Sequence, residues 1–413
     1  MSQAIAVAAA GPSAARFPAL RVPAYRWYWL TSTISMVADN IEHVIGYWLL
    51  WELTHSPFWL GYAVISHWAP FILFSPFAGA WADRFDNRKL LQVSQGLYVL
   101  CSGGLGLLYL TGHLQLWHMV ILLLVHGFSG VVQLPSSQVL IHDLVRKDEL
   151  ASALSLSAGS RNVAQFLGPL VGGFLLWALG PGGGLLANVL IYIPFTIALL
   201  LLRPRRTTAP VRRATGLQGV LEGLGFVLQH RVMLGAILIV SIPMGVLGGF
   251  QAMMPAFAAE LDPDPRAYTW LLTANGAGAI TGAVILGALG RVRRKGLLLC
   301  FASLLWAALL LAFAITPWFW LAFLLMLFVG AWSIVSNAMS QTLVQHLAPD
   351  DKRGRVMGTY GMLVHGPRVF SGVLLGGAGA ALGAHLGLGV LAALVVAAVA
   401  GLILTLPALR VVE

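Results

Sequence analysis

Three ionisable residues stand close together in an otherwise apolar stretch of the chain. Asp39, Glu42 and His43 lie within residues 27–52. At the angular spacing of an α-helix, these three side chains and Gly46 share an arc of about 100°. Burial and a neighbouring imidazolium shift the pKa of a carboxyl group in opposite directions, so the pKa of such a group can be adjusted for proton exchange near neutral pH. The segment therefore predicts proton coupling or substrate contact, with a static intramembrane pair as the alternative.

Basic and aromatic side chains form a second set of candidates. Arg161 and Arg368 are the only arginines that we expect inside apolar segments, and each needs a carboxylate or an anionic substrate as its partner. Histidines such as His67 serve more often in packing, and neither histidine nor cysteine spacing indicates a metal site or a cofactor. The other residues that are candidates for a pocket wall or a polar contact are Tyr47, Trp48, Trp68, His126 and His365.

The composition shows which kind of element must hold these residues. Of 413 residues, 58% are hydrophobic and 10% are charged, and the mean hydropathy is +0.83, which indicates a membrane protein. A helix crosses the bilayer with about 20 apolar residues, so the chain has room for about twelve spans. The apolar segments are too long and continuous for the alternating strands of a barrel. Helices are predicted at 27–52, 58–82, 90–110, 117–141, 150–178, 185–202, 233–257, 269–289, 297–315, 318–343, 356–379 and 387–406.

The positive charges fall on one side of the predicted membrane. Lysine and arginine gather before the first span, after every second span and in the tail, whereas the opposite loops hold only Arg266. Both termini are therefore expected in the cytoplasm. The net charge of +10 is interpreted as topology and contact with anionic membrane lipid, not as nucleic-acid binding.

A long charged connection divides the spans into six plus six. Its later part is mildly amphipathic, so it is expected to be either a short helix on the membrane surface or a solvated linker. Segments 138–144 and 341–347 resemble each other, and parallel repeats of six helices are a transporter architecture. The predicted parts are a cytoplasmic N-terminal segment, a six-helix bundle, a cytoplasmic linker, a second six-helix bundle and a cytoplasmic tail, at 1–26, 27–202, 203–232, 233–406 and 407–413.

A compact group of charges between two apolar runs carries a family resemblance. Residues 79–89 resemble the loop 2–3 signature of the major facilitator superfamily through Gly79, Asp83, Arg84, Arg88 and Lys89, with Asp86 in place of the usual glycine. Further likeness points to the branch of enterobactin-type siderophore exporters and macrolide exporters. It lies in residues 144–150, 168–173 and 353–358.

The resemblance implies a fold and roles for particular residues. The fold is all-α, with 12 transmembrane helices in two bundles related by a pseudo-twofold axis. Residues 79–89 are implied to close the cytoplasmic side, with Asp83 against the helix that begins near Val356. The segment with Gly168, Pro169, Gly172 and Gly173 is similar to the antiporter signature, and a generic packing face is the alternative. The family's cavity-lining helices add three polar candidates, Gln133, Gln251 and Asn337.

These observations predict a secondary transporter. The leading hypothesis is a monomeric, proton-coupled antiporter of the bacterial inner membrane that exports a small amphipathic molecule, such as a siderophore or a drug, by alternating access. An importer or a divalent-metal exporter of the same fold is the first alternative, and a membrane sensor or enzyme is the second. No nucleophile elbow, zinc-binding helix or phosphate-binding loop supports an enzyme, and no ATP-hydrolysing domain is recognised, so a gradient is expected to supply the energy.

Overall fold

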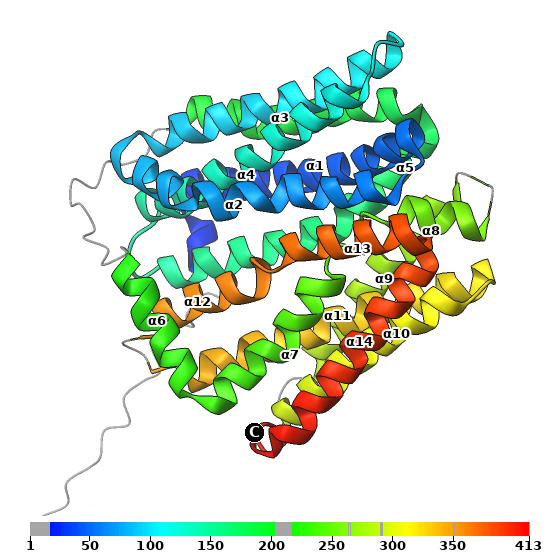
Figure 1. Ribbon diagram of the computed structural model, residues 1–413. Helices are drawn as coiled ribbons and strands as arrows, with labels where there is room; N and C mark the ends of the chain where they lie inside the picture. Colours follow the sequence, from blue (N-terminus) through cyan, green and yellow to red (C-terminus); the bar gives the residue numbers. More distant parts are fainter. Residues whose placement is uncertain are drawn as a thin grey trace, which may run out of the picture.

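The chain folds into helices throughout the part that can be described. The computed structural model describes residues 17–202, 217–262, 264, 266–289, 292–349 and 352–412. Every regular element in these ranges is a helix, and the helices form two groups that lie side by side (Figure 1). The prediction of an all-α protein is thereby confirmed.

Five long helices from the first half of the chain form one group. After a short 3-10 helix, η1 (Pro18–Arg21), they are α1 (Pro23–Thr54), α2 (Pro57–Arg84), α3 (Asn87–Leu110), α4 (Leu116–Leu144) and α5 (Leu150–Leu201). The last helix covers two predicted spans, 150–178 and 185–202. Gly180 interrupts it with φ 68° and ψ 177°, a backbone conformation that favours glycine.

The second half forms the other group, and two of its predicted spans are broken. Its helices are α6 (Leu217–Gln229), α7 (Arg231–Leu247), α8 (Met254–Leu261), α9 (Arg266–Leu289), α10 (Lys295–Ile315), α11 (Phe319–Leu347), α12 (Arg353–His365), α13 (Arg368–Leu382), α14 (Ala384–Thr405) and α15 (Pro407–Arg410). The predicted helix 233–257 is divided into α7 and α8, and 356–379 into α12 and α13. Pro367 precedes α13 and lacks the N–H that a continuous helix needs.

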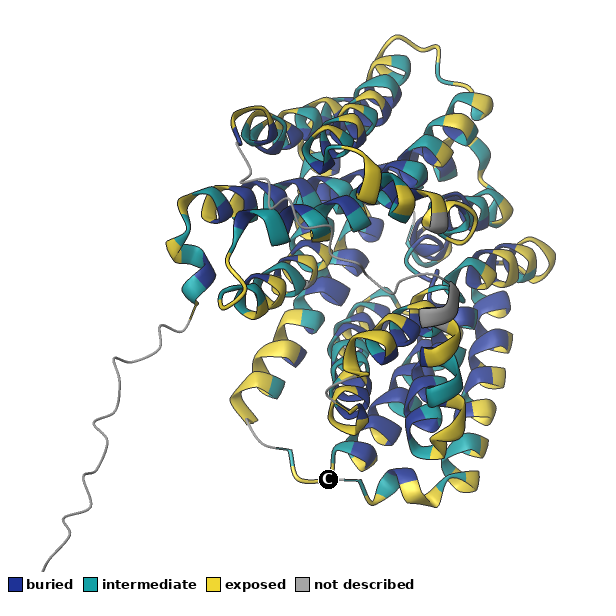
Figure 2. Cartoon of the chain, turned by 90° about the vertical axis from the view of Figure 1, so that its left-hand side faces the viewer, coloured by how far each residue is buried: buried dark blue, intermediate teal, exposed yellow. Residues whose placement is uncertain are grey.

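Eight helices in the described ranges are long and apolar enough to cross a membrane by themselves. A ninth span results if α6 and α7, which meet at a bend of 105°, are counted as one. Exposed stretches lie on the outward sides of helices in both groups (Figure 2), and many of the exposed residues are large and apolar, as lipid contact requires. The membrane fold is supported, and the number of twelve spans stays a prediction.

The later part of the predicted linker is a helix. Residues 203–216 lie outside the described residues, but α6 follows and packs on α12. Arg355 Nη1 and Glu222 Oε2 are 2.6 Å apart across this contact. A helix therefore forms in this segment and packs on the second group, whereas its position on the membrane surface stays a prediction.

The two groups of helices contact each other over part of their length. We call the end at which α2 passes into α3 the linker end and the opposite end, with the α1–α2 turn, the far end. The main contacts join α2 to α13 and α5 to α9. At the far end, Gly61 is so close to Gly372 and Gly376 that an added Cβ atom would lie 2.3 Å from the Gly372 carbonyl oxygen. Towards the linker end, α12 packs on α6, α7 and α11 of its own group.

The charged segment 79–89 forms the turn at the linker end. Because α2 runs through Arg84 and α3 begins at Asn87, the turn itself is only two residues long. Asp86 Oδ1 accepts a hydrogen bond from the Arg88 N–H at 2.9 Å and caps α3, which gives a physical reason for aspartate in place of glycine. Arg88 Nη1 donates to the Leu202 carbonyl oxygen at 2.7 Å. Asp83 has no hydrogen bond or ion pair within the described residues, so a contact with α12 is not formed in this conformation.

Candidate functional site

A buried cluster of acids and histidines lies in the middle of the first group. His126 on α4 stands between two carboxyl groups of α1 and is 3% exposed. Its Nδ1 is hydrogen bonded to Glu42 Oε1 at 2.9 Å, and its Nε2 lies 3.0 Å from Asp39 Oδ1. The Glu42 side chain is 2% exposed and that of Asp39 is 26% exposed. The predicted polar face of α1 therefore meets α4 inside one group, and only its Asp39 end is open.

Two further histidines extend the cluster. His43 Nδ1 is 2.8 Å from the carbonyl oxygen of Asp39, and because that oxygen only accepts, Nδ1 carries the proton. His43 Nε2 then points to His67 Nδ1 on α2, at 3.0 Å. One ring nitrogen each from His43, His67 and His126 lie within 4.8 Å of one another.

Tyrosines close the cluster on its inner side. Tyr192 on α5 donates its hydroxyl hydrogen to Glu42 Oε2 at 3.4 Å. Tyr98 on α3 stacks on Tyr192 with ring centroids 5.5 Å apart and meets the His126 ring edge-on at 5.0 Å. A cavity of about 10 Å³ remains beside the three histidines and Glu42, which is room for about one water molecule or ion.

Close backbone contacts bring these helices into register. Gly127, next to His126, lies against the backbone of α2, where an added Cβ atom would be 2.2 Å from the Ser66 carbonyl oxygen. In the predicted helix-5 motif, Gly168 lies equally close to Asn40 of α1. Gly172 packs on α1 as well, whereas Gly173 faces Thr269 of α9. The motif thus packs α5 against the polar segment of α1 and against the second group.

A positively charged region adjoins the cluster at the contact between the groups. The Arg368 guanidinium lies over the Trp68 ring, 4.9 Å from its centroid, and Nη2 donates to the Gly248 carbonyl oxygen at 3.0 Å. Its Nε is buried and has no hydrogen-bond partner. The His365 ring stacks on the Trp68 ring, with ring centroids 6.4 Å apart. Neither arginine pairs with a carboxylate anywhere in the described ranges.

The remaining predicted contacts have ordinary partners. Tyr47 packs edge-on against His43, and Trp48 stacks on Tyr268 of α9 with centroids 5.5 Å apart, so Trp48 belongs to the contact between the groups. Gln251 Nε2 donates to Asn275 Oδ1 at 2.9 Å. Asn337 Nδ2 donates to the Ser333 carbonyl oxygen of its own helix. Gln133 is half-buried, and the structure does not bring it into the cluster.

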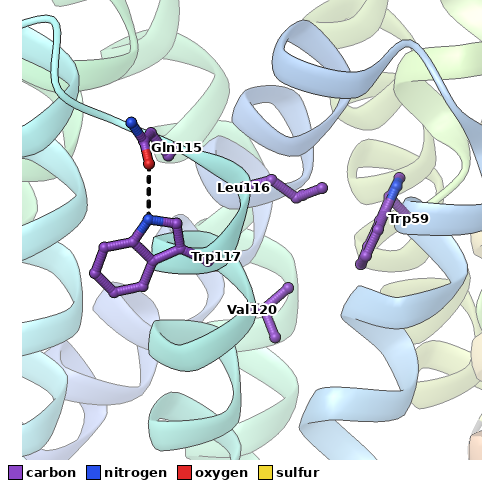
Figure 3. Close-up of a pocket in the computed structure, with 5 residues that line it drawn as sticks. All are labelled: Trp59, Gln115, Leu116, Trp117 and Val120. Carbon is purple, nitrogen blue, oxygen red and sulfur yellow. Dashed lines mark hydrogen bonds between the residues drawn. The ribbon is translucent and has the colours of Figure 1, made fainter.

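A larger groove lies away from these charged groups. It has a volume of about 480 Å³ and is lined by Trp59, Gln115, Leu116, Trp117 and Val120 at the far end of α2 and α4 (Figure 3). Trp117 Nε1 donates to Gln115 Oε1 at 2.8 Å. The groove offers no ionisable side chain, and tryptophans of this kind favour the membrane–water interface. The acid–histidine cluster is therefore the better candidate site.

Sequence reasoning missed part of the cluster. Tyr98 and Tyr192 were not singled out, because a tyrosine in an apolar helix has no spacing that reveals its partner. His67 was interpreted as a packing residue, but it contacts His43. The glycine that follows His126 is the one signal that marked α4 for a close approach to another helix.

Comparison with known proteins relates the chain to membrane transporters. The sequence matches the transmembrane secretion effector family of the major facilitator superfamily over residues 14–413. The uncharacterized MFS-type transporter YfiS of Bacillus subtilis is 26% identical over 353 residues, 79% of this chain and 80% of that protein. The enterobactin exporter EntS of Shigella boydii is 25% identical over 364 residues, 87% of this chain and 86% of that protein. A D-xylose-proton symporter shares the fold with a TM-score of 0.71 at 13% identity, over 91% of this chain and 97% of the symporter.

Proposed function

The chain belongs to the transmembrane secretion effector family of the major facilitator superfamily and is a multi-pass transporter of the bacterial inner membrane; on this premise we propose that it exports a small amphipathic molecule in exchange for protons. The observation that carries the proposal is the position of His126 between Asp39 and Glu42. Charges at such depth in a membrane protein are costly and are usually functional.

The three side chains form a path for a proton. Asp39 is the exposed end and Glu42 the enclosed end, and an imidazole can accept a proton on one nitrogen and release another from the second. The Nδ1 of His126 is already hydrogen bonded to Glu42, whereas Asp39 Oδ1 lies near Nε2 without an aligned hydrogen bond. We propose that a rotation of the Asp39 carboxyl group aligns Oδ1 with His126 Nε2 and completes the path.

The packing of α5 connects this path to movement between the groups. α5 lies on the polar segment of α1 through Gly168 and on α9 of the second group through Gly173. Alternating access in such folds is largely rigid-body rocking of one bundle against the other. A change of charge in the cluster therefore acts on the helices that the rocking motion must move.

We further propose that the exported molecule carries a negative charge beside an aromatic or apolar part. Arg368 is half-buried, its Nε is buried without a hydrogen-bond partner and no carboxylate pairs with it, and Trp68 offers an aromatic face next to it. A cation that is largely removed from water is stabilised by a partner of opposite charge, which an anionic substrate supplies. The name of the relative EntS supports export, and the distribution of Lys and Arg supports a cytoplasmic position of the linker end.

Transport into inverted vesicles tests the proton coupling. Cells that lack their own efflux pumps supply vesicles with the wild type, Glu42→Gln or Glu52→Gln, and enterobactin and a macrolide are the first probes. We expect a proton gradient to drive uptake by the wild type and by Glu52→Gln but not by Glu42→Gln. Glu52 is the matched control because it lies on the same helix but is exposed at the far end.

Two results would contradict the proposal. Unchanged gradient-driven transport by Glu42→Gln would remove the cluster from the coupling mechanism. Gradient-driven uptake in right-side-out vesicles, without uptake in inverted ones, would show an importer.

A further inference from the structure

We infer that His43, His67, His126 and Asp39 form a binding site for a divalent transition metal ion, with Zn²⁺ as the best match. The inference goes beyond the proposed exporter, because it concerns binding of a metal and holds for either direction of transport. It rests on the arrangement of donor atoms from three helices.

The three imidazole rings have the spacing of a metal site. Their centroids are 4.6 Å, 4.8 Å and 5.8 Å apart for the pairs His43–His67, His43–His126 and His67–His126. Zn²⁺ binds imidazole nitrogen at about 2.0–2.1 Å in tetrahedral geometry, which places ring centroids about 5 Å apart. A small cavity, about 10 Å³ in volume, lies beside the three rings.

The hydrogen bonds show which donor atoms of the cluster are available to a metal ion. His43 uses Nδ1 for the Asp39 carbonyl oxygen, so in the neutral ring the lone pair is on Nε2 and accepts the hydrogen bond from His67 Nδ1–H. A metal ion bound between these two nitrogens displaces the proton from His67 Nδ1 to its Nε2 or to water. His126 uses Nδ1 for Glu42, which leaves Nε2 buried and without a hydrogen bond. Asp39 Oδ1, 3.0 Å from that nitrogen, also has no hydrogen bond. A cation between these two atoms satisfies both, at ligand–ligand distances close to those of a tetrahedral site.

The surrounding groups match those that support bound metals. Histidine ligands usually donate their other N–H to a carboxylate or a carbonyl oxygen, which holds the ring in place. The Glu42 carboxylate accepts this hydrogen bond from His126, and the Asp39 carbonyl oxygen accepts it from His43. If the three imidazoles are neutral, the carboxylates of Asp39 and Glu42 together carry two negative charges, which one divalent cation neutralises.

The donor set selects the kind of metal. Three imidazole nitrogens and one carboxylate oxygen suit Zn²⁺, Co²⁺ or Ni²⁺, whereas Mg²⁺ and Ca²⁺ prefer oxygen ligands only. The hydrogen bond between His43 and His67 must open by a few tenths of an ångström to admit the ion, because neighbouring ligand nitrogens of tetrahedral Zn²⁺ are about 3.3 Å apart. This displacement is within the reach of a side-chain rotation.

Metal binding to the purified full-length chain tests the inference. The protein is prepared without a polyhistidine tag in lipid nanodiscs, treated with a chelator, and titrated with Co²⁺ and Zn²⁺. We expect the intense visible absorption of tetrahedral Co²⁺, its displacement by Zn²⁺ but not by Mg²⁺, and a higher melting temperature with Zn²⁺.

Variants separate the cluster from other histidines. His67→Ala is expected to lose the tetrahedral spectrum and the thermal stabilisation. Glu42→Gln keeps all four ligands and is expected to bind about 10- to 100-fold more weakly, as for other outer partners of metal ligands. His113→Ala is the control, because His113 is exposed in the α3–α4 turn.

The outcomes are distinct from those of the transport test. Absence of tetrahedral Co²⁺ binding in the folded wild type, or the same binding in His67→Ala, would overturn the metal site. If either of these results were found and the wild type still showed proton-driven transport, the proposed function would remain intact. Metal binding together with unaltered transport by Glu42→Gln would overturn the coupling proposal alone.

Discussion

Replacement of Gly61 by alanine tests whether the far-end contact holds the two groups in the observed conformation. A Cβ atom at this position would lie 2.3 Å from the Gly372 carbonyl oxygen and 2.8 Å from Gly376 Cα. Ordinary carbon–oxygen contacts begin at about 3.3 Å, so α2 and α13 must separate by about 1 Å. The perturbation therefore acts on the conformation in which the far end is closed.

The magnitude follows from the cost of overpacking. Extra methyl groups in a tightly packed interface cost about 1–3 kcal/mol. Each 1.4 kcal/mol changes a ratio of populations tenfold, so the closed far end loses roughly 5- to 150-fold in population relative to the open one. The better helix propensity of alanine acts equally in both conformations and cancels in this ratio.

Pulsed electron paramagnetic resonance measures the shift at the opposite end. Spin labels are attached to Gly79→Cys and Gly358→Cys, where added side chains meet no atom within 4 Å, after Cys101 and Cys300 have been replaced. Rocking of the two groups predicts that Gly61→Ala shortens the distance between the labels.

Gly377→Ala is the matched control for this experiment. Gly377 lies on α13, next to Gly376 of the far-end contact, but its Cβ atom would meet nothing within 4 Å, so we expect the wild-type distances. Identical distance distributions for Gly61→Ala and Gly377→Ala would refute the reasoning that the glycine contact determines the conformation.

Three further predictions concern single interactions. Arg368→Gln removes a charge-assisted contact worth about 1.5–3 kcal/mol, so the KM for an anionic substrate should rise roughly 10- to 150-fold in vesicle uptake, while a neutral analogue should be unaffected. Asp86→Ala removes the cap of α3 and should lower the free energy of unfolding by about 0.5–2 kcal/mol, seen as a lower melting temperature in detergent. Glu222→Gln breaks a half-exposed ion pair with Arg355 and should change the free energy of unfolding by less than about 1 kcal/mol in the same assay.

Each of these has a control within the chain. Arg266→Gln removes a charge at the start of α9, away from Trp68, and an equal rise in KM would argue against a role of the Arg368 charge. Asp83→Ala removes an exposed carboxylate that caps no helix, and a loss of stability equal to that of Asp86→Ala would contradict the capping argument. A large loss in Glu222→Gln would mean that α6 is held mainly by this pair and not by packing on α12.

Local patterns in the sequence were enough to predict most of the helices. Continuous apolar runs predicted helices because each helix satisfies its own backbone hydrogen bonds, whatever its neighbours are. Breaks were predicted unevenly. The interruption at Gly180 falls between the predicted spans 150–178 and 185–202, whereas those at residues 248–253 and at Pro367 fall inside segments that were predicted as single spans. The common face of Asp39, Glu42 and His43 was predictable as well, because it depends only on the helical repeat.

The partners of that face were decided by the tertiary structure. Contacts of His126 with two carboxyl groups, and of His43 with His67, depend on how far α4 and α2 slide along α1. That register is set by close backbone approaches such as Gly127 on Ser66, which join residues far apart in the chain. The sequence by itself thus determined a membrane transporter with charges in its first span, whereas the packing of three helices determined that these charges meet two further histidines, because no local periodicity records which side chains face one another across helices.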